Sequence, residues 1–274
     1  MYNKAIKITV TLLVIVCNVF IAMNIGGEVV PDPVPEPDYA SSEPEASVVS
    51  EFDPSTPHSV YDMKDKTLTE LKEYNPDTVA WITIPGTTCD NVVVLGEDKI
   101  RGRDYYLNHS FDHRETTAGT LYIDYRTTFT AEKFSSNITI YGHHLLDKTM
   151  FTQIKNYRDI NFYREHPYFT FETIYGEYDC QVFALYVVDL TTKEGANFDF
   201  RGPDYASDEE YATYIEAIKK RSEISCPVDI GPNDSILTLC TCTYVSNDAR
   251  LMVAAKLVPK GEGGNVDVSA AYKK

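Results

Sequence analysis

The sequence contains no CxxC pair, although it has six cysteines in 274 residues. Structural zinc sites and disulfide frameworks usually bring cysteines together in closely spaced pairs, so neither kind of site explains this set well. Cys89 and Cys180 are predicted to fill small apolar spaces, and Cys17 lies in an apolar N-terminal run. Only Cys242 stands in a context that predicts chemistry.

Positively charged side chains are also scarce. Lysine and arginine number 25 against 41 aspartates and glutamates, which gives a formal net charge of -16. A protein that binds the phosphate backbone of a nucleic acid normally presents a basic face, so we expect no nucleic-acid partner. The length predicts one domain of about 200 residues with appendages.

Charge is absent altogether from residues 8–25, and Lys4 and Lys7 precede this run. At about 1.5 Å per residue, a helix of this length spans roughly 27 Å, close to the hydrocarbon thickness of a bilayer. Residues 1–25 are therefore predicted to be a cytoplasmic tip and a transmembrane anchor, with the rest of the chain outside the cell. A cleaved signal peptide is the alternative, but no convincing small-x-small cleavage site follows.

Residues 26–57 contain no lysine or arginine and are rich in Pro, Ser, Glu and Asp. Such a segment buries too little apolar surface to offset the entropy lost on ordering, and its like charges extend it. It is predicted to link the anchor to a folded domain over residues 58–260. Residues 261–274 are predicted to be a flexible tail.

The folded domain contains short β-type runs separated by Gly, Asp and Asn. Their number predicts a mostly β protein with added helices, built on a closed barrel of about eight strands. The runs are residues 79–84, 92–95, 120–123, 137–141, 168–173, 178–188 and a C-terminal hairpin. Helical spacing predicts a helix within 62–75, short helical pieces in 148–163 and a long helix over 207–224, capped by Ser207, with an apolar face made by Tyr211, Tyr214, Ile215 and Ile218.

The hairpin lies in residues 235–259, where a β-type run, a polar turn at 246–248 and a second apolar run follow one another. Because side chains alternate along a strand, Cys240 and Cys242 share one face. Arg250 opens the second strand, so its guanidinium can lie beside Cys242. A neighbouring cation favours the thiolate or stabilises an oxyanion, which predicts nucleophilic chemistry at Cys242. The alternatives are a buried structural cysteine at 242 and, for Arg250, a surface ion pair with Asp248 or a nearby glutamate.

A thiol nucleophile also needs an imidazole partner. His143 is the best candidate, because it follows Gly142 at the end of the β-type run 137–141. His144 is adjacent, but neighbouring residues of an extended segment point to opposite sides, so only one of the two faces Cys242. A zinc site made by Cys240, Cys242, His143 and His144 is a further alternative, although ligands at these spacings rarely converge on one tetrahedral centre.

Several of these segments together resemble the sortases. Residues 238–242, TLCTC, resemble the TLxTC signature of that family, and Arg250 and the Tyr141-Gly142-His143 segment resemble its arginine and histidine motifs. Residues 80–94, 104–111 and 140–151 are most similar to the class B branch, as is the predicted helix before the cysteine strand. The resemblance covers roughly residues 60–259.

The resemblance implies a sortase β-barrel and cysteine transpeptidation at the surface of Gram-positive cells. By motif position, Cys242 is the nucleophile, His143 the acid and base, and Arg250 the group that stabilises the substrate carbonyl or oxyanion. The residues expected to contact the substrate are Asn108, Tyr141, Cys240, Thr241 and Thr243. The family pattern often has serine where this sequence has Cys240. No metal and no cofactor is expected.

The implied partners follow from the same resemblance. A class B sortase cleaves the C-terminal sorting signal of a secreted protein after threonine and holds the acyl group as a thioester. It passes this group to an amine of the peptidoglycan cross-bridge, of its lipid-linked precursor, or of a pilin lysine. We expect a monomer in the cell membrane, with a single span and an extracellular catalytic domain.

Two readings from other classes are open at this stage. One is a membrane-tethered, acidic binding module without enzymatic activity, in which residues 238–242 serve only as core. The other is a different cysteine acyltransferase of the cell wall, such as an L,D-transpeptidase. That family places its histidine and cysteine in a short Ser-His-Gly-Cys segment, which this sequence lacks.

Overall fold

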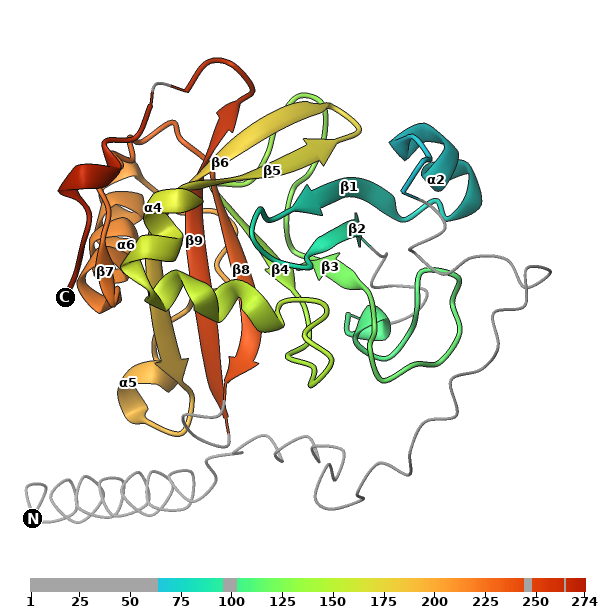
Figure 1. The fold of residues 1–274 in the computed structure, drawn as a ribbon, viewed down its shortest axis with the longest axis horizontal. Coiled ribbons are helices and arrows are strands. Elements are labelled where there is room, and N and C mark those ends of the chain that lie inside the picture. Colours follow the sequence, from blue (N-terminus) through green and yellow to red (C-terminus); the bar gives the residue numbers. More distant parts are fainter. Residues whose placement is uncertain (1–63, 96–102, 244–247, 264) are drawn as a thin grey trace, which may run out of the picture. The chain divides into compact units, whose positions relative to one another are not determined.

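The computed structural model describes residues 64–95, 103–243, 248–263 and 265–274, and its centre is a closed barrel of eight strands (Figure 1). The strands follow one another around the barrel in the order β1-β2-β3-β4-β8-β9-β6-β5. They are β1 (Thr78–Thr83), β2 (Asp90–Val94), β3 (Leu121–Ile123), β4 (Asn137–Tyr141), β5 (Tyr168–Thr173), β6 (Gly176–Asp189), β8 (Ile236–Thr243) and β9 (Ala249–Pro259). The predicted fold class is confirmed.

The predicted anchor and linker lie outside the described residues. No helix in the described ranges is both long enough and apolar enough to cross a bilayer.

The predicted hairpin consists of β8 and β9, which pair antiparallel, while β4 runs parallel to β8 on its other side. Side chains alternate between two apolar clusters along these strands. Leu237 and Leu239 belong to the cluster enclosed by the barrel, whereas Ile236 and Cys240 belong to a cluster on its outer face. The cysteine strand is therefore buried on both faces along most of its length, and its C-terminal end is the accessible part.

Helix α6 (Asp208–Arg221) covers that outer face and packs against β6. Ser207 caps it by accepting a hydrogen bond from the Glu210 amide, and three acidic residues in the first turn complement the helix dipole. Its buried residues are the four predicted from helical spacing, Tyr211, Tyr214, Ile215 and Ile218. The long helix before the cysteine strand is confirmed, with its end three residues earlier than predicted.

Helix α2 (Leu68–Tyr74) covers another part of the barrel through Leu68 and Leu71. The sequence predicts a helix within 62–75. The helix begins only at Leu68 because Thr67 and Glu70 form a reciprocal capping box, which satisfies the first free amides at that point.

The stretch at 148–163 was expected to contain short helical pieces, and it does. The 3-10 helix η3 (Thr152–Arg158) ends at Asp159, which caps α4 (Ile160–Glu165) by accepting from the Asn161 amide. Two further short helices, η2 (Tyr105–Leu107) and α5 (Lys193–Ala196), are not evident from helical spacing because each is about one turn long.

The C-terminal residues differ from the predicted flexible tail. They form η4 (Val268–Ala270) and β10 (Tyr272–Lys273), and β10 pairs with β7 (Ile224–Ser225). Ala271 is buried, and its carbonyl accepts a hydrogen bond of 2.8 Å from Arg164. The polar composition of this segment hides the pairing, because a two-residue strand is held by main-chain hydrogen bonds and needs no apolar run.

Candidate active site

Cys242 lies near the C-terminal end of β8 and its side chain is exposed. Cys240, two residues earlier on the same face, is only 2% exposed because it packs under the outer cluster. The reading of Cys242 as a buried structural cysteine is therefore wrong. Of the cysteines in the described ranges, Cys242 is the most exposed.

Arg250 is the cross-strand partner of Cys242 in the β8–β9 hairpin. Its guanidinium pairs with the Asp248 carboxylate, with Nη2 lying 2.8 Å from Oδ1, and Nη1 donates to the Ala249 carbonyl at 3.4 Å. The cross-strand pairing expected from the sequence and the alternative ion pair with Asp248 are thus both present. The ion pair restrains the guanidinium at the strand end that carries Cys242.

His143 follows β4 in a segment that lies beside the end of β8. The Gly142 amide donates to the Cys240 carbonyl at 3.1 Å, and the Phe151 amide donates to the His143 carbonyl at 3.1 Å. Tyr141 is the register partner of Cys240, so the chain that continues from β4 runs beside the end of β8 that carries Cys242.

The His143 ring is oriented by a main-chain group. Its Nε2 lies 2.8 Å from the Leu107 carbonyl oxygen, at the end of η2. A carbonyl only accepts, so Nε2 carries a hydrogen, and in the neutral ring the lone pair is on Nδ1. This contact takes the place of the carboxylate that orients the imidazole in a serine triad. The sequence does not indicate it, because a carbonyl has no side-chain signature.

His144 has a different environment from His143. Its Nδ1 lies 3.0 Å from the carbonyl oxygen of Cys242, so this ring contacts the main chain of the cysteine strand. The two rings thus point to different partners, as the alternation of an extended segment predicts. Within the described ranges no three His, Cys, Asp or Glu side chains gather in a way that could hold a metal ion, so the four-residue zinc alternative is not formed.

Gly142 is required by close packing at the turn between β4 and His143. A Cβ at this position would lie 2.4 Å from Leu121 Cδ2 and 2.7 Å from Phe151 Cδ2. Both of these side chains are essentially fully buried. The absence of a side chain at residue 142 therefore allows the histidine segment to run close to the barrel.

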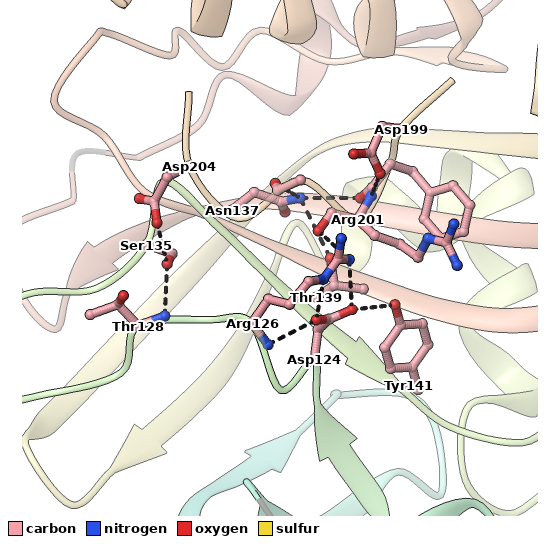
Figure 2. A network of polar contacts seen from close by, with 12 residues as sticks. Asp124, Arg126, Thr128, Ser135, Asn137, Thr139, Tyr141, Asp199, Arg201 and Asp204 are labelled. Carbon is pink, nitrogen blue, oxygen red and sulfur yellow. Dashed lines mark hydrogen bonds and ion pairs between the residues drawn. The ribbon is translucent and has the colours of Figure 1, made fainter. Parts of the chain in front are cut away.

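Tyr141, the last residue of β4, takes part in a polar network (Figure 2). Its hydroxyl donates to Asp124 Oδ2 at 2.8 Å, and the Asp124 carboxylate also accepts two bonds from the Arg126 guanidinium, at 2.9 and 3.0 Å. Burial alone would raise the pKa of Asp124, but the donors from Arg126 and Tyr141 prevail and hold this pKa below its usual range. Burial, together with Cys240 and Asp124, raises the pKa of Tyr141, so its hydroxyl remains protonated.

The residues expected to contact substrate fall into two groups. Asn108, Tyr141 and Thr243 are exposed or half-buried, and Asn108 directly follows the residue that binds His143. Thr241 is only 2% exposed and lies on the opposite face of β8 from Cys242. Its side chain therefore faces the barrel interior and is not presented on the face that carries the thiol.

Cys240 was also expected to contact the substrate, and its side chain is buried as well. Burial raises the pKa of its thiol to about 12, the charge of Cys242 adds to this rise, and the nearby Arg250 and Arg201 only partly offset it. At neutral pH Cys240 is therefore a protonated, enclosed thiol. Cys242 is thus the accessible thiol of this strand.

The sortase domain profile matches residues 82–258, which is more than half of the chain. The chain belongs to the sortase family. Sortase B of Listeria monocytogenes is 30% identical over 218 residues, which cover 79% of this chain and 83% of that protein. The class B assignment made from the sequence is confirmed, and this sortase is a cysteine transpeptidase. The reading as a non-enzymatic module is therefore excluded.

Solved structures place this sortase in the same class. The Staphylococcus aureus sortase B–substrate complex has a TM-score of 0.63 and 28% identity, and the match covers 74% of this chain and 90% of that chain. A sortase B structure complexed with triglycine has a TM-score of 0.62 and 30% identity, and covers 70% of this chain and 86% of that chain. The fold of the described domain is thus the sortase B fold.

Proposed function

We propose that Cys242 is the nucleophile of this sortase, that His143 is its acid and base, and that Arg250 stabilises the substrate carbonyl. The observation that carries this proposal is the convergence of three strand ends. The exposed thiol of Cys242 faces the register position of Arg250, and the chain after β4 carries an oriented imidazole alongside it.

In the acylation step, the Cys242 thiolate attacks the carbonyl carbon of the substrate threonine and forms a tetrahedral oxyanion. Arg250 supplies positive charge to this oxygen. The C–N bond then breaks, and the departing amide nitrogen takes a proton from His143. Because Nε2–H is bonded to Leu107, Nδ1 is the nitrogen that takes the Cys242 thiol proton when the thiolate forms, and this is the proton that passes to the departing nitrogen. The product is a thioester on Sγ and a released C-terminal peptide.

In the transfer step, an amine attacks the thioester carbonyl, His143 Nδ1 accepts a proton from its nitrogen, and Sγ leaves as a thiolate. An amine of the cell-wall cross-bridge, of its lipid-linked precursor or of a pilin lysine would serve. The sortase B structure complexed with triglycine supports a glycine amine as an acceptor. Asn108, Tyr141 and Thr243 would contact the bound sorting signal.

The location of the enzyme follows from its sequence. Residues 1–25 would anchor the chain in the cell membrane, and residues 26–57 would carry the catalytic domain outside the cell. Substrates and lipid-linked acceptors that are held in the same membrane gain effective concentration from such an anchor. Fractionation of cells that express the full chain, with and without residues 1–25, tests this placement. Recovery of the full chain in the soluble fraction would contradict it.

The catalytic assignment is tested by peptide cleavage with the full-length protein in detergent. A library of fluorogenic C-terminal sorting-signal peptides identifies the preferred sequence. Cys242→Ala should abolish cleavage of that peptide, whereas Cys240→Ala, at the buried thiol on the same face, should retain it. Cleavage that survives in Cys242→Ala would remove the assignment.

A further inference from the structure

The segment from Phe200 to Asp204, called here the wall segment, lies between α5 and α6 and is held by an unusual set of bonds (Figure 2). Asn137 Nδ2 donates to the carbonyls of residues 200 and 202 at 3.2 Å each, and its main-chain amide donates to that of residue 203 at 2.9 Å. Arg126 Nη2 donates to the Arg201 carbonyl at 2.7 Å. Four consecutive carbonyls of the wall segment thus accept hydrogen bonds from Asn137, in β4, or from Arg126.

The wall segment covers one end of a row of side chains on the outer face of β4 and β8. Parallel pairing sets Thr139 beside Thr238 and Tyr141 beside Cys240. The Thr238 hydroxyl donates to Asn137 Oδ1 at 2.8 Å, which ties the two strands together beneath the wall segment. Every one of these residues except Tyr141 is at most 2% exposed.

The side chains of this row become accessible to solvent at the end nearest the candidate active site. Tyr141 is half-buried and Cys242 is exposed, so the accessible part of the row begins where the wall segment stops covering it. We infer that a peptide reaching Cys242 along this face passes the Tyr141 ring and the end of the wall segment. The charges of Arg201 and Asp124 both act on the Cys240 thiol, which places both residues near this point.

Arg126 connects the Tyr141 side chain, through Asp124, with the wall segment. One edge of its guanidinium forms the paired bonds to Asp124, which also accepts from the Tyr141 hydroxyl, and its Nη2 also donates to the wall segment. Asp124 accepts a further bond of 3.0 Å from the Arg126 amide, so the pair is fixed relative to its own turn. A planar guanidinium can make these contacts together, whereas a lysine ammonium acts as a single point charge.

We propose that Arg126 is a positioning residue for substrate binding by this sortase. Through Asp124 it fixes the Tyr141 ring, and through the Arg201 carbonyl it fixes the wall segment, so both sides of the path to Cys242 are held at a set separation. This inference rests on the proposed function. It adds that the site selects its peptide with a preformed wall, and that Arg126 acts on peptide binding rather than on the thiol.

The test compares Arg126→Met with Arg158→Met in the full-length protein in detergent. Arg158 is a matched control, because it also makes paired bonds to a carboxylate, that of Glu223, and both arginine side chains are 34% exposed. Three quantities are measured for each variant: KM and kcat for the preferred peptide, the alkylation rate of Cys242 by a small neutral reagent, and the Tm.

Arg126→Met should raise KM roughly tenfold, the effect expected for the loss of a charged hydrogen bond, while kcat and the alkylation rate change less than about twofold. Arg158→Met should leave KM unchanged. Arg126→Lys should not restore KM, because it keeps the charge and loses the fork. Tyr141→Phe should raise KM through the same connection, and combining it with Arg126→Met should add little, since both changes break one chain of contacts. If Arg126→Met does not fold, Tyr141→Phe and Arg126→Lys provide the same measurement.

Two results would overturn the positioning role alone. One is a folded Arg126→Met variant with the KM of the wild type. The other is an equal loss of cleavage and of alkylation in step with Tm, which indicates a purely structural role. The proposed function fails in a different way, by the absence of cleavage in the wild type or by its persistence in Cys242→Ala, and the positioning role then falls with it.

Discussion

Gly142→Ala is the substitution whose effect on the site follows most directly from packing. The new Cβ would lie 2.4 Å from Leu121 Cδ2 and 2.7 Å from Phe151 Cδ2. Ordinary carbon contacts are near 3.5 Å, so the structure must open by about 1 Å. The two neighbours are 1% and 0% exposed, so neither can relieve the contact by moving into solvent.

The magnitude has two parts. Overpacking of this kind costs about 1–3 kcal/mol, which lowers Tm by roughly 2–12 °C for a domain of this size. A shift of the main chain at residue 142 is transmitted to His143, the next residue, and to the bond between its Nε2 and the Leu107 carbonyl. A misplacement of about 1 Å costs on the order of 10²-fold in rate. We therefore expect kcat for peptide cleavage to fall about 100-fold.

The assay measures kcat and KM with the preferred peptide, together with Tm. Gly231→Ala is the control, because the nearest atom to a Cβ there is Asp234 Oδ2 at 3.4 Å, and it should change neither quantity appreciably. A Gly142→Ala enzyme with the Tm and kcat of the wild type would refute the reasoning, since it would mean that the histidine segment does not depend on this contact.

Three further outcomes follow from the same structure. The pKa of Asp124 is lower in the folded than in the unfolded state, since donors from Arg126 outweigh its burial, so its stabilising contribution is complete above the unfolded pKa of about 3.9 and is lost as the pH falls through the folded value. Urea denaturation should therefore show that Asp124→Asn is less stable than the wild type at pH 7 and that this difference in stability shrinks below about pH 4. A difference in stability that does not depend on pH would contradict this. Cys240 should be alkylated far more slowly than Cys242 in the folded protein at pH 8, because burial raises its pKa to about 12; peptide mapping by mass spectrometry measures both sites, and equal labelling would be inconsistent with an enclosed thiol. Arg250→Gln should lower kcat about 10²- to 10³-fold with little change in KM, as expected for the loss of an oxyanion donor. Steady-state kinetics that show only a change in KM would assign Arg250 to peptide binding instead.

Sequence patterns predicted those parts of the fold that are governed by local periodicity. The limits of β4 and β5 and the buried face of α6 agree with the structure because a run of alternating or helically spaced side chains has one stable placement against a core. The pairing of β7 with β10 and the single turns of η2 and α5 were missed. The β7–β10 pairing is specified by main-chain bonds between distant residues, and η2 and α5 are single turns too short for a periodic pattern, so the sequence gives no signal for any of them.

The candidate site divides in the same way. Cys242, His143 and Arg250 were predicted from their motifs and remain the proposed catalytic residues, while the structure shows the two histidine rings bonded to different main-chain carbonyls. The Leu107 carbonyl could not be found, nor could the bond between Arg126 and the Arg201 carbonyl, which joins residues 75 positions apart. Thr241 was assigned to the substrate although its alternation with Cys242 already pointed it inward. Its burial shows that the alternation of side chains along the strand, and not closeness to Cys242 in the motif, determines which way the Thr241 side chain points.

The central claim is that the acyl group of the sorting signal is carried on the sulfur of Cys242. Full-length protein mixed with its preferred peptide and quenched in acid within seconds should contain an adduct with the mass of the peptide up to its threonine. Proteolytic mapping should place this adduct on Cys242, and hydroxylamine should release it as expected for a thioester. Cleavage that proceeds with no adduct, or with the adduct on another residue, would contradict the account.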